Sequence, residues 1–283
     1  MNKLNVLLEC GSSELHAIAA SQARFEAEIL LAHVLQKPRS YLHTWPEAVI
    51  PSHSIDQFKL LITRRSQGEP IAYITGRREF WSLDLEVTTD TLIPRAETET
   101  LVEHVLAQLE NIARPQIVDL GTGSGAIALA IASERPDANI TATDNSANAL
   151  AVAQKNAERL GLQNISFLFS NWFDQLALEQ YHLIVSNPPY VADDDPHLTQ
   201  GDVRFEPVSA LSSGKDGLDD IRHLCHAAPK YLKVGGWLYL EHGYNQAHET
   251  RVILESEQFV NLGHACDLSN TPRISWGQKP LRY

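Results

Sequence analysis

The four residues Asn187-Pro188-Pro189-Tyr190 combine fixed hydrogen-bond acceptors with a flat aromatic ring. Neither proline carries an N–H group and both have a fixed φ, so the segment is expected to form a rigid turn. Its acceptors, the Asn187 side-chain oxygen and the Pro188 carbonyl, can hold the two N–H groups of one planar amide or amino nitrogen. Stacking on Tyr190 would keep that group in place. Alignment and electrostatics would then direct a weak nitrogen nucleophile towards an electrophilic carbon.

A glycine-rich segment, Gly121-Thr122-Gly123-Ser124-Gly125, lies between a predicted strand and a predicted helix. Glycines at these positions allow a tight turn and let a ligand approach the backbone closely. Asp144 ends the next predicted strand, where a carboxylate can accept hydrogen bonds from both hydroxyl groups of a ribose. Together these features indicate an adenosine-containing ligand, in preference to a turn that serves packing alone.

Two ligands satisfy this pattern. The segment matches G-x-G-x-x-A, so a nicotinamide dinucleotide stays open. Asp119 lies two residues before Gly121, and its carboxylate would repel a pyrophosphate and attract a cationic amino group. S-adenosyl-L-methionine (SAM) has an amino group and a sulfonium charge but no phosphate. The residues therefore favour SAM, whose methyl group is an electrophilic carbon of the kind that the turn at Asn187 would require.

Alternating strands and helices are predicted to position these residues. Apolar strand segments at 116–120, 139–144, 165–170, 182–186 and 237–241 alternate with helices at 97–109, 124–134, 146–160, 219–232 and 246–257. This alternation predicts a parallel sheet with helices on its faces. Segments 259–267 and 274–281 have no helix between them, which predicts a closing hairpin. Ser146 is expected to cap its helix and Gly161 to end it.

The first 95 residues follow a different pattern. Apolar residues at helical spacing predict a helical domain over 1–70. β-prone residues at 71–76 and 80–87 predict a hairpin linker over 71–95, with its turn near 76–78. Residues 96–283 would then form the sheet domain. Within it, the segment 192–218 has the length of a lid.

Composition and charge exclude several classes of protein. Hydrophobic residues make up 43% of the chain, which supports folded cores. No apolar run reaches the roughly 18 residues of a membrane span, and we expect no signal peptide. Three dispersed cysteines predict free thiols in the cytoplasm and no zinc cluster. The net charge of −12, concentrated after residue 95, opposes a direct nucleic-acid substrate. We expect a monomer without a metal site.

The motifs at 119–125, Asp144 and 187–190 resemble those of class I SAM-dependent methyltransferases that act on amide or exocyclic amino nitrogens. Three further strings, at 92–99, 170–173 and 202–207, are similar to the PrmC (HemK) family, which methylates the glutamine of the Gly-Gly-Gln motif in peptide-chain release factors. The resemblance covers nearly the whole chain. It implies an α/β, Rossmann-like fold with a mostly parallel sheet and a terminal antiparallel hairpin.

By position, the resemblance implies roles for individual residues. SAM contacts are expected at Gly121, Thr122, Gly123, Ser124, Gly125, Asp144, Trp172 and Asn187, and contacts to the substrate glutamine at Asn187, Pro188, Pro189 and Tyr190. Of these, Asn187, Pro188 and Tyr190 would be catalytic. The helical domain would recognise the release factor. One departure is that the family's Pro-Arg-Pro-Asp reads Pro94-Arg95-Ala96-Glu97 here, which lengthens the acidic side chain.

Two other functions stay open at this point. Adenine methylation in DNA or RNA uses the same Asn-Pro-Pro-Tyr turn, but the acidic charge and the absence of a basic recognition domain oppose it. A module that binds a nucleotide without catalysis is the other alternative. The intact acceptor turn at Asn187 favours catalysis over that module.

Overall fold

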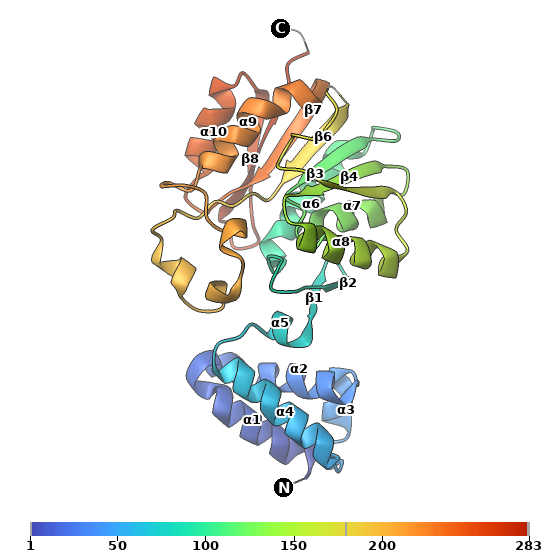
Figure 1. Cartoon of the computed structure of the whole chain (residues 1–283), viewed down its shortest axis with the longest axis vertical. Helices are drawn as coiled ribbons and strands as arrows, with labels where there is room; N and C mark the ends of the chain where they lie inside the picture. The colour runs from blue at the N-terminus through green and yellow to red at the C-terminus, as the bar shows by residue number, and fades with distance from the viewer. Residues whose placement is uncertain (1, 179, 282–283) are drawn as a thin grey trace. The chain divides into compact units, whose positions relative to one another are not determined.

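The computed structural model describes residues 2–178 and 180–281 and divides into two compact units (Figure 1). Unit 1 contains Met1–Arg77 and Gly201–Phe205, and unit 2 contains Arg78–Gln200 and Glu206–Tyr283. The chain therefore leaves unit 2 after residue 200, contributes a short segment to unit 1 and returns at residue 206. Within the described ranges, no helix is long and apolar enough to cross a bilayer.

Unit 1 is a bundle of helices. Its elements are α1 Leu4–Ala19, the 3₁₀ turn Ala20–Gln22, α2 Ala23–Leu35, α3 Arg39–Thr44, α4 Ser52–Ser66 and α5 Ile71–Thr75. Leucine, isoleucine and phenylalanine side chains of α1, α2 and α4 form a common core. At Gly11 an added Cβ would lie 2.7 Å from the Phe58 ring, so glycine lets α1 and α4 approach closely. The predicted helical N-terminal region is confirmed.

A buried arginine ties the segment Gly201–Phe205 to these helices. The Arg65 guanidinium pairs with the two Glu26 carboxylate oxygens at 2.8 and 3.1 Å, and with the Asp202 carboxylate at 2.8 Å. Arg204 donates to the backbone oxygen of Gln67 at 2.7 Å. Because Arg65 and Glu26 are buried, solvent screens this ion pair little. Both contacts fix the segment within unit 1.

The strand predicted at 71–76 is wrong, because Ile71–Thr75 form helix α5. Pro70 precedes the helix with φ at −58°, and its carbonyl accepts the N–H groups of Tyr73 and Ile74. Gly76 ends the helix in the left-handed conformation. A proline before the first turn and a glycine after the last turn outweigh the β-propensity of the residues between them.

The hairpin consists of β1 Arg77–Phe80 and β2 Leu83–Glu86, which form a two-stranded sheet. Its turn lies at Trp81 and Ser82, where φ is 52° and 58°, and not at the predicted position near 76–78. Two successive residues with positive φ match the turn type that joins twisted strands. Neither residue is a glycine or an asparagine, so the sequence carries no strong signal for this turn.

A seven-stranded sheet with the order β5-β4-β3-β6-β7-β9-β8 is the centre of unit 2. Its strands are β3 Gln116–Leu120, β4 Asn139–Asp144, β5 Ile165–Phe169, β6 Tyr181–Ser186, β7 Leu232–Glu241, β8 Val260–Cys266 and β9 Pro272–Gln278. Strands β3 to β7 pair in parallel, whereas β9 is antiparallel to both β7 and β8. The predicted parallel sheet and its closing hairpin are confirmed.

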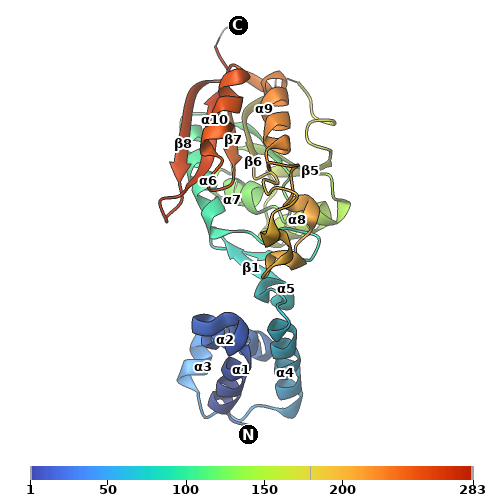
Figure 2. The same ribbon diagram turned by 90° about the vertical axis from the view of Figure 1, so that its left-hand side faces the viewer.

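Helices cover both faces of this sheet (Figures 1 and 2). One face carries α6 Glu99–Leu109, α7 Ala126–Glu134 and α8 Ala147–Leu160, and the other carries α9 Asp219–Tyr231 and α10 Ala247–Ser256. Strand β6 is buried on both sides, since Leu183 and Val185 enter one core and Ile184 enters the other. Ser146 caps α8 through the Ala149 N–H at 3.2 Å, and Gly161 ends it, as predicted.

Candidate active site

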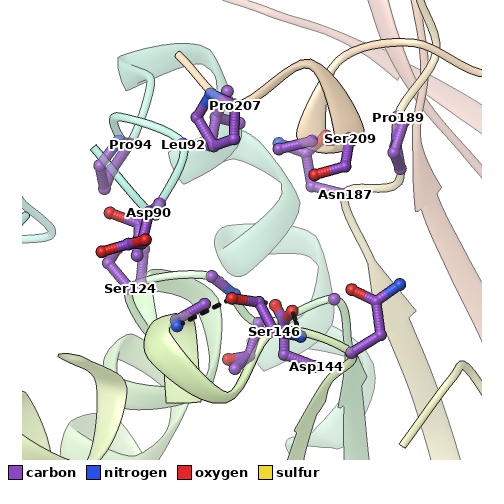
Figure 3. A pocket seen from close by; sticks show the side chains of 18 of the residues that line it. Asp90, Leu92, Pro94, Ser124, Asp144, Ser146, Asn187, Pro189, Pro207 and Ser209 are labelled. Carbon is purple, nitrogen blue, oxygen red and sulfur yellow. Dashed lines mark hydrogen bonds between the residues drawn. The ribbon is translucent and has the colours of Figure 1, made fainter. Parts of the chain in front are cut away.

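The predicted site residues follow neighbouring strands of the sheet. The glycine segment follows β3, Asp144 ends β4, and Asn187 follows β6. The chain runs from β3 outward through β4 and β5 and then returns to β6 on the other side of β3. In open parallel sheets, ligands bind at such a reversal of strand order, beyond the carboxyl ends of the strands. A cavity of about 310 Å³ lies there (Figure 3).

The glycine segment is a tight, well-anchored turn. Gly121, Gly123 and Gly125 all have positive φ, at 72°, 56° and 87°. An added Cβ at Gly125 would lie 2.8 Å from the Leu129 side chain. Both this close contact and the positive φ therefore require glycine at this position. The Thr122 N–H donates to the Thr143 carbonyl at 2.8 Å. The segment therefore holds its backbone against the cavity and leads directly into α7.

Asp144 is held in one orientation by backbone donors. Its Oδ2 accepts the Gly123 N–H at 2.9 Å, and its Oδ1 accepts the Ser146 N–H at 2.9 Å. Burial raises the pKa of Asp144, and these two bonds and a further one from Asn145 oppose that shift. A carboxylate has about four acceptor sites, so Asp144 can accept a further hydrogen bond beyond these backbone donors. The fixed carboxylate is thus suited to a pair of neighbouring hydroxyl groups.

Asp119 lies behind the cavity wall and does not form part of it. Its side chain is fully buried, and its Oδ2 accepts the Thr122 hydroxyl at 2.6 Å. Burial raises the pKa of Asp119 to about 7. Thr122, and not Asp119, lines the cavity. The Asp119 carboxyl group therefore lies behind Thr122, and its preference for a cationic ligand over a pyrophosphate stays a prediction.

The side chain of Asn187 is oriented by a threonine that the sequence does not single out. Its Nδ2 donates to the Thr98 hydroxyl oxygen at 3.4 Å, which leaves Oδ1 available as an acceptor. The turn behind it is anchored, because the Tyr190 N–H donates to the Leu211 carbonyl at 3.1 Å. The Tyr190 hydroxyl donates to Oε1 of the buried Glu241 at 3.3 Å. Burial also raises the pKa of Tyr190, so its phenol stays protonated.

A buried carboxylate joins two segments that complete the cavity wall. Glu206 accepts the Ile93 N–H at 3.0 Å and pairs with the Arg95 guanidinium. Residues 89–95 and 207–210 flank these contacts, and both segments line the cavity. Figure 3 shows Pro94 and Leu92 on one side of the opening and Pro207 beside them. The sequence marks these segments only by their resemblance to a family.

The structure brings eight of the eleven predicted site residues to the cavity wall. They are Gly121, Thr122, Gly123, Ser124, Asp144, Trp172, Asn187 and Pro189. The remaining three, Gly125, Pro188 and Tyr190, are not among the lining residues. The Trp172 ring lies 3.4 Å from where a Cβ of Gly121 would be, so it packs over the glycine turn. Glu97 is exposed in a 3₁₀ turn and does not line the cavity.

Thr98, Asn156 and Glu241 are supporting residues that the sequence analysis missed. Asn156 is fully buried and donates to the carbonyl oxygens of Ser124 and Glu86, at 3.0 and 2.9 Å. It thereby joins the glycine segment to the hairpin. In residues 2–178 and 180–281, no group of three or more His, Cys, Asp or Glu side chains is placed to bind a metal ion.

Comparisons with known proteins match both units. The PrmC N-terminal domain family matches residues 7–76, and the methyltransferase small domain family matches residues 96–203. A release factor glutamine methyltransferase of Xylella fastidiosa is 49% identical over 271 residues, which are 95% of this chain and 98% of the relative. Those of Pseudomonas aeruginosa and Escherichia coli are 50% and 46% identical, over 90% and 92% of this chain and 92% and 94% of theirs.

Solved structures with this fold have more distant sequences. A methyltransferase of Pyrococcus furiosus has a TM-score of 0.53 at 16% identity, and the alignment covers 77% of this chain and 97% of that one. The catalytic domain of hMettl16 has a TM-score of 0.57 at 16% identity, with coverages of 79% and 82%. These likenesses confirm the predicted class I methyltransferase fold.

Proposed function

The chain belongs to the release factor glutamine methyltransferase family, and from this premise we propose that it methylates release factors in the cytoplasm. The methyl group would pass from SAM to the side-chain amide nitrogen of the glutamine in their Gly-Gly-Gln motif. The observation that carries the proposal is that one cavity has two walls with different chemical groups (Figure 3). Asp144 and the glycine segment form one wall, and Asn187 and Pro189 form the other.

Charge and free acceptors make the first wall suitable for SAM. Asp144 keeps acceptor capacity for the ribose hydroxyls, because its backbone donors do not occupy all of the lone pairs of its carboxylate. Asp90 adds a second carboxylate to the wall, which favours a cationic ligand over a pyrophosphate. Trp172, beside Gly121, offers a ring for adenine. SAM supplies an electrophilic methyl group when it is bound.

The second wall would hold the substrate amide. Because Asn187 donates its amide nitrogen to Thr98, its Oδ1 can accept one N–H of the substrate glutamine. The Pro188 carbonyl would accept the other N–H. With both N–H groups held, the amide plane and its nitrogen are fixed relative to the first wall. The contribution of these residues is alignment, which can supply a large part of a rate enhancement without any covalent intermediate.

Methyl transfer from radiolabelled SAM, offered in parallel to a release factor, to tRNA and to DNA, tests this proposal. We expect the label on the release factor, and specifically on the Gly-Gly-Gln glutamine, because the net charge of −12 repels a nucleic-acid backbone. Replacement of that glutamine in the release factor should abolish the labelling. Labelling of DNA or tRNA in preference to the release factor would reject the substrate and support the adenine alternative.

We further propose that the helices of unit 1, predicted as a domain over residues 1–70, recognise the release factor. The residues that line the cavity all belong to unit 2, so the helices take no part in forming it. A chain without residues 1–77 should bind SAM with unchanged affinity but should methylate an intact release factor with a several-fold lower kcat/KM. Calorimetry and initial rates measure the two quantities.

A control separates recognition from the loss of one anchored segment. Removal of the helices also deprives Gly201–Phe205 of the contacts made by Arg65 and Gln67. The full-length double variant Asp202→Ala, Arg204→Ala releases that segment and keeps the helices. We expect this variant to retain most activity. An equal loss in both proteins would assign the effect to the segment, and full activity of the shortened chain would reject recognition by the helices.

A further inference from the structure

Glu241 is a buried carboxyl group beside the candidate site, and nothing in the proposed methyl transfer uses it directly. It ends β7, next to β6, where Leu240 is the register partner of Ser186, the residue that precedes Asn187. Its exposed fraction is 2%. A glutamate is rarely buried so completely unless other groups hydrogen-bond to it or pair with it. Its partners therefore indicate what it does.

Two hydroxyl groups from the site act on this carboxyl group. The Tyr190 hydroxyl donates to Oε1 at 3.3 Å, and a side-chain hydrogen bond from Thr98 is the largest of the influences that lower the pKa of Glu241. Oε2 is buried and has no hydrogen-bond partner in the described part of the chain. A hydroxyl proton rotates to suit its surroundings, so the Thr98 proton can turn towards this open acceptor.

The charges around Glu241 determine when it is ionised. Burial raises the pKa of Glu241 to about 7, while Thr98, Tyr190 and Arg273 lower it and Glu97 raises it further. The adjacent His242 is bonded to the Gly243 carbonyl and the Ser275 hydroxyl, and burial lowers its pKa. The carboxyl group consequently changes its charge near neutral pH, while the histidine beside it stays uncharged.

Thr98 connects this carboxyl group to Asn187. Its Oγ1 accepts the Asn187 Nδ2–H at 3.4 Å, so its single proton must be donated elsewhere. We propose that ionised Glu241 takes this proton and acts as a positioning residue that keeps the Asn187 Oδ1 free for the substrate amide. The inference rests on the proposed function, because the substrate glutamine is the expected partner of that oxygen.

Protonation of Glu241 would reverse the direction of these hydrogen bonds. A neutral carboxyl group donates to Thr98, Thr98 then donates to the Asn187 Oδ1, and the amide rotates to present its NH₂ group. An NH₂ group cannot accept an N–H from the substrate. The rate of methyl transfer should therefore rise with pH as Glu241 ionises.

Single-turnover methylation of a release factor at saturating SAM tests the hydrogen-bond chain. Thr98→Val keeps the side-chain shape but removes the hydroxyl, and we expect a rate about tenfold or more below wild type. Thr98→Ser restores the hydroxyl and should restore the rate. Thr250→Val is the matched control, because its buried hydroxyl in α10 has no hydrogen-bond partner in the described ranges. Equal rates for Thr98→Val and wild type would overturn the proposal.

NMR of the Asn187 side-chain amide in the ligand-free protein tests the orientation without catalysis. In the wild type, its signals should shift with a midpoint near the Glu241 pKa of about 7, and Glu241→Gln should abolish the shift. Asp119 also has a pKa of about 7, but it is present in both proteins, so the difference reports Glu241 alone. Identical titrations would overturn the inference. A wild-type protein that shows the titration but methylates no release factor would overturn the proposed function instead.

Discussion

We expect the single-turnover rate of methyl transfer to fall about 10²- to 10³-fold when Asn187 is replaced by alanine, at saturating SAM and release factor. The alanine keeps the turn, because two prolines and the Tyr190 N–H bond to Leu211 hold its backbone. It deletes the oxygen that would accept an N–H of the target amide, together with the Nδ2 group that donates to Thr98. A rate near that of the wild type would make Asn187 a structural residue and would reject the alignment mechanism.

Asn187→Asp is the companion variant, because it keeps an acceptor at the same position and adds a negative charge. That charge attracts the cationic ground state of SAM more than a transition state in which the charge disperses. We therefore expect a loss of turnover with retained or tighter SAM binding, measured by calorimetry. An aspartate variant that binds SAM more weakly but turns over normally would show that charge at this position acts on binding alone.

A second large effect is expected on SAM affinity. Asp144→Ala should raise the Kd for SAM at least tenfold, because each charge-assisted hydrogen bond contributes about 1.5–3 kcal/mol. Calorimetry on the purified variant measures this. The substitution also leaves the N–H groups of Gly123 and Ser146 without their acceptor, so thermal unfolding must confirm that the variant is folded.

Asp90→Ala is a matched control for the loss of charge. Asp90 lines the same cavity, but it is exposed and its carboxylate accepts the side-chain amide of Asn148 at 3.0 Å. If Asp144 acts through directed hydrogen bonds to the ribose, Asp90→Ala should weaken SAM binding much less. Equal losses in the two variants would indicate a general electrostatic effect, and unchanged affinity in Asp144→Ala would remove that residue from the site.

The sequence predicts the sheet domain well because its signals there are local. Each parallel strand is a short apolar run between polar residues. The ends of α8 are marked by Ser146, whose side chain caps the helix, and by Gly161, which adopts the left-handed conformation. The glycine segment and Asp144 also follow their strands directly. Since the carboxyl ends of parallel strands meet at one edge, their predicted proximity required no knowledge of distant contacts.

The sequence predicts less where contacts join distant parts of the chain. The strand expected at 71–76 ignores Pro70, whose carbonyl starts a helix that Gly76 ends. Thr98 contacts Asn187 and Glu241 contacts Tyr190, from segments that are about 90 and 50 residues away in sequence. Thr98 lies in the string 92–99, but nothing in that string indicates a contact with Asn187, and Glu241 belongs to no motif. The pairing of β6 with β7 brings Glu241 next to the site. Contacts of this kind depend on the tertiary fold.

The path of residues 201–205 through unit 1 has a consequence for synthesis on the ribosome. At typical elongation rates, the residues from 78 to 205 take roughly 6–25 s to be made. During that interval the helices must fold without Asp202, while their buried Arg65 already has Glu26 as a partner. In the nascent chain, the charge of Arg65 therefore has a carboxylate partner before Asp202 is made. The helical unit receives the segment Gly201–Phe205 only after the glycine turn and Asn187 have been synthesised.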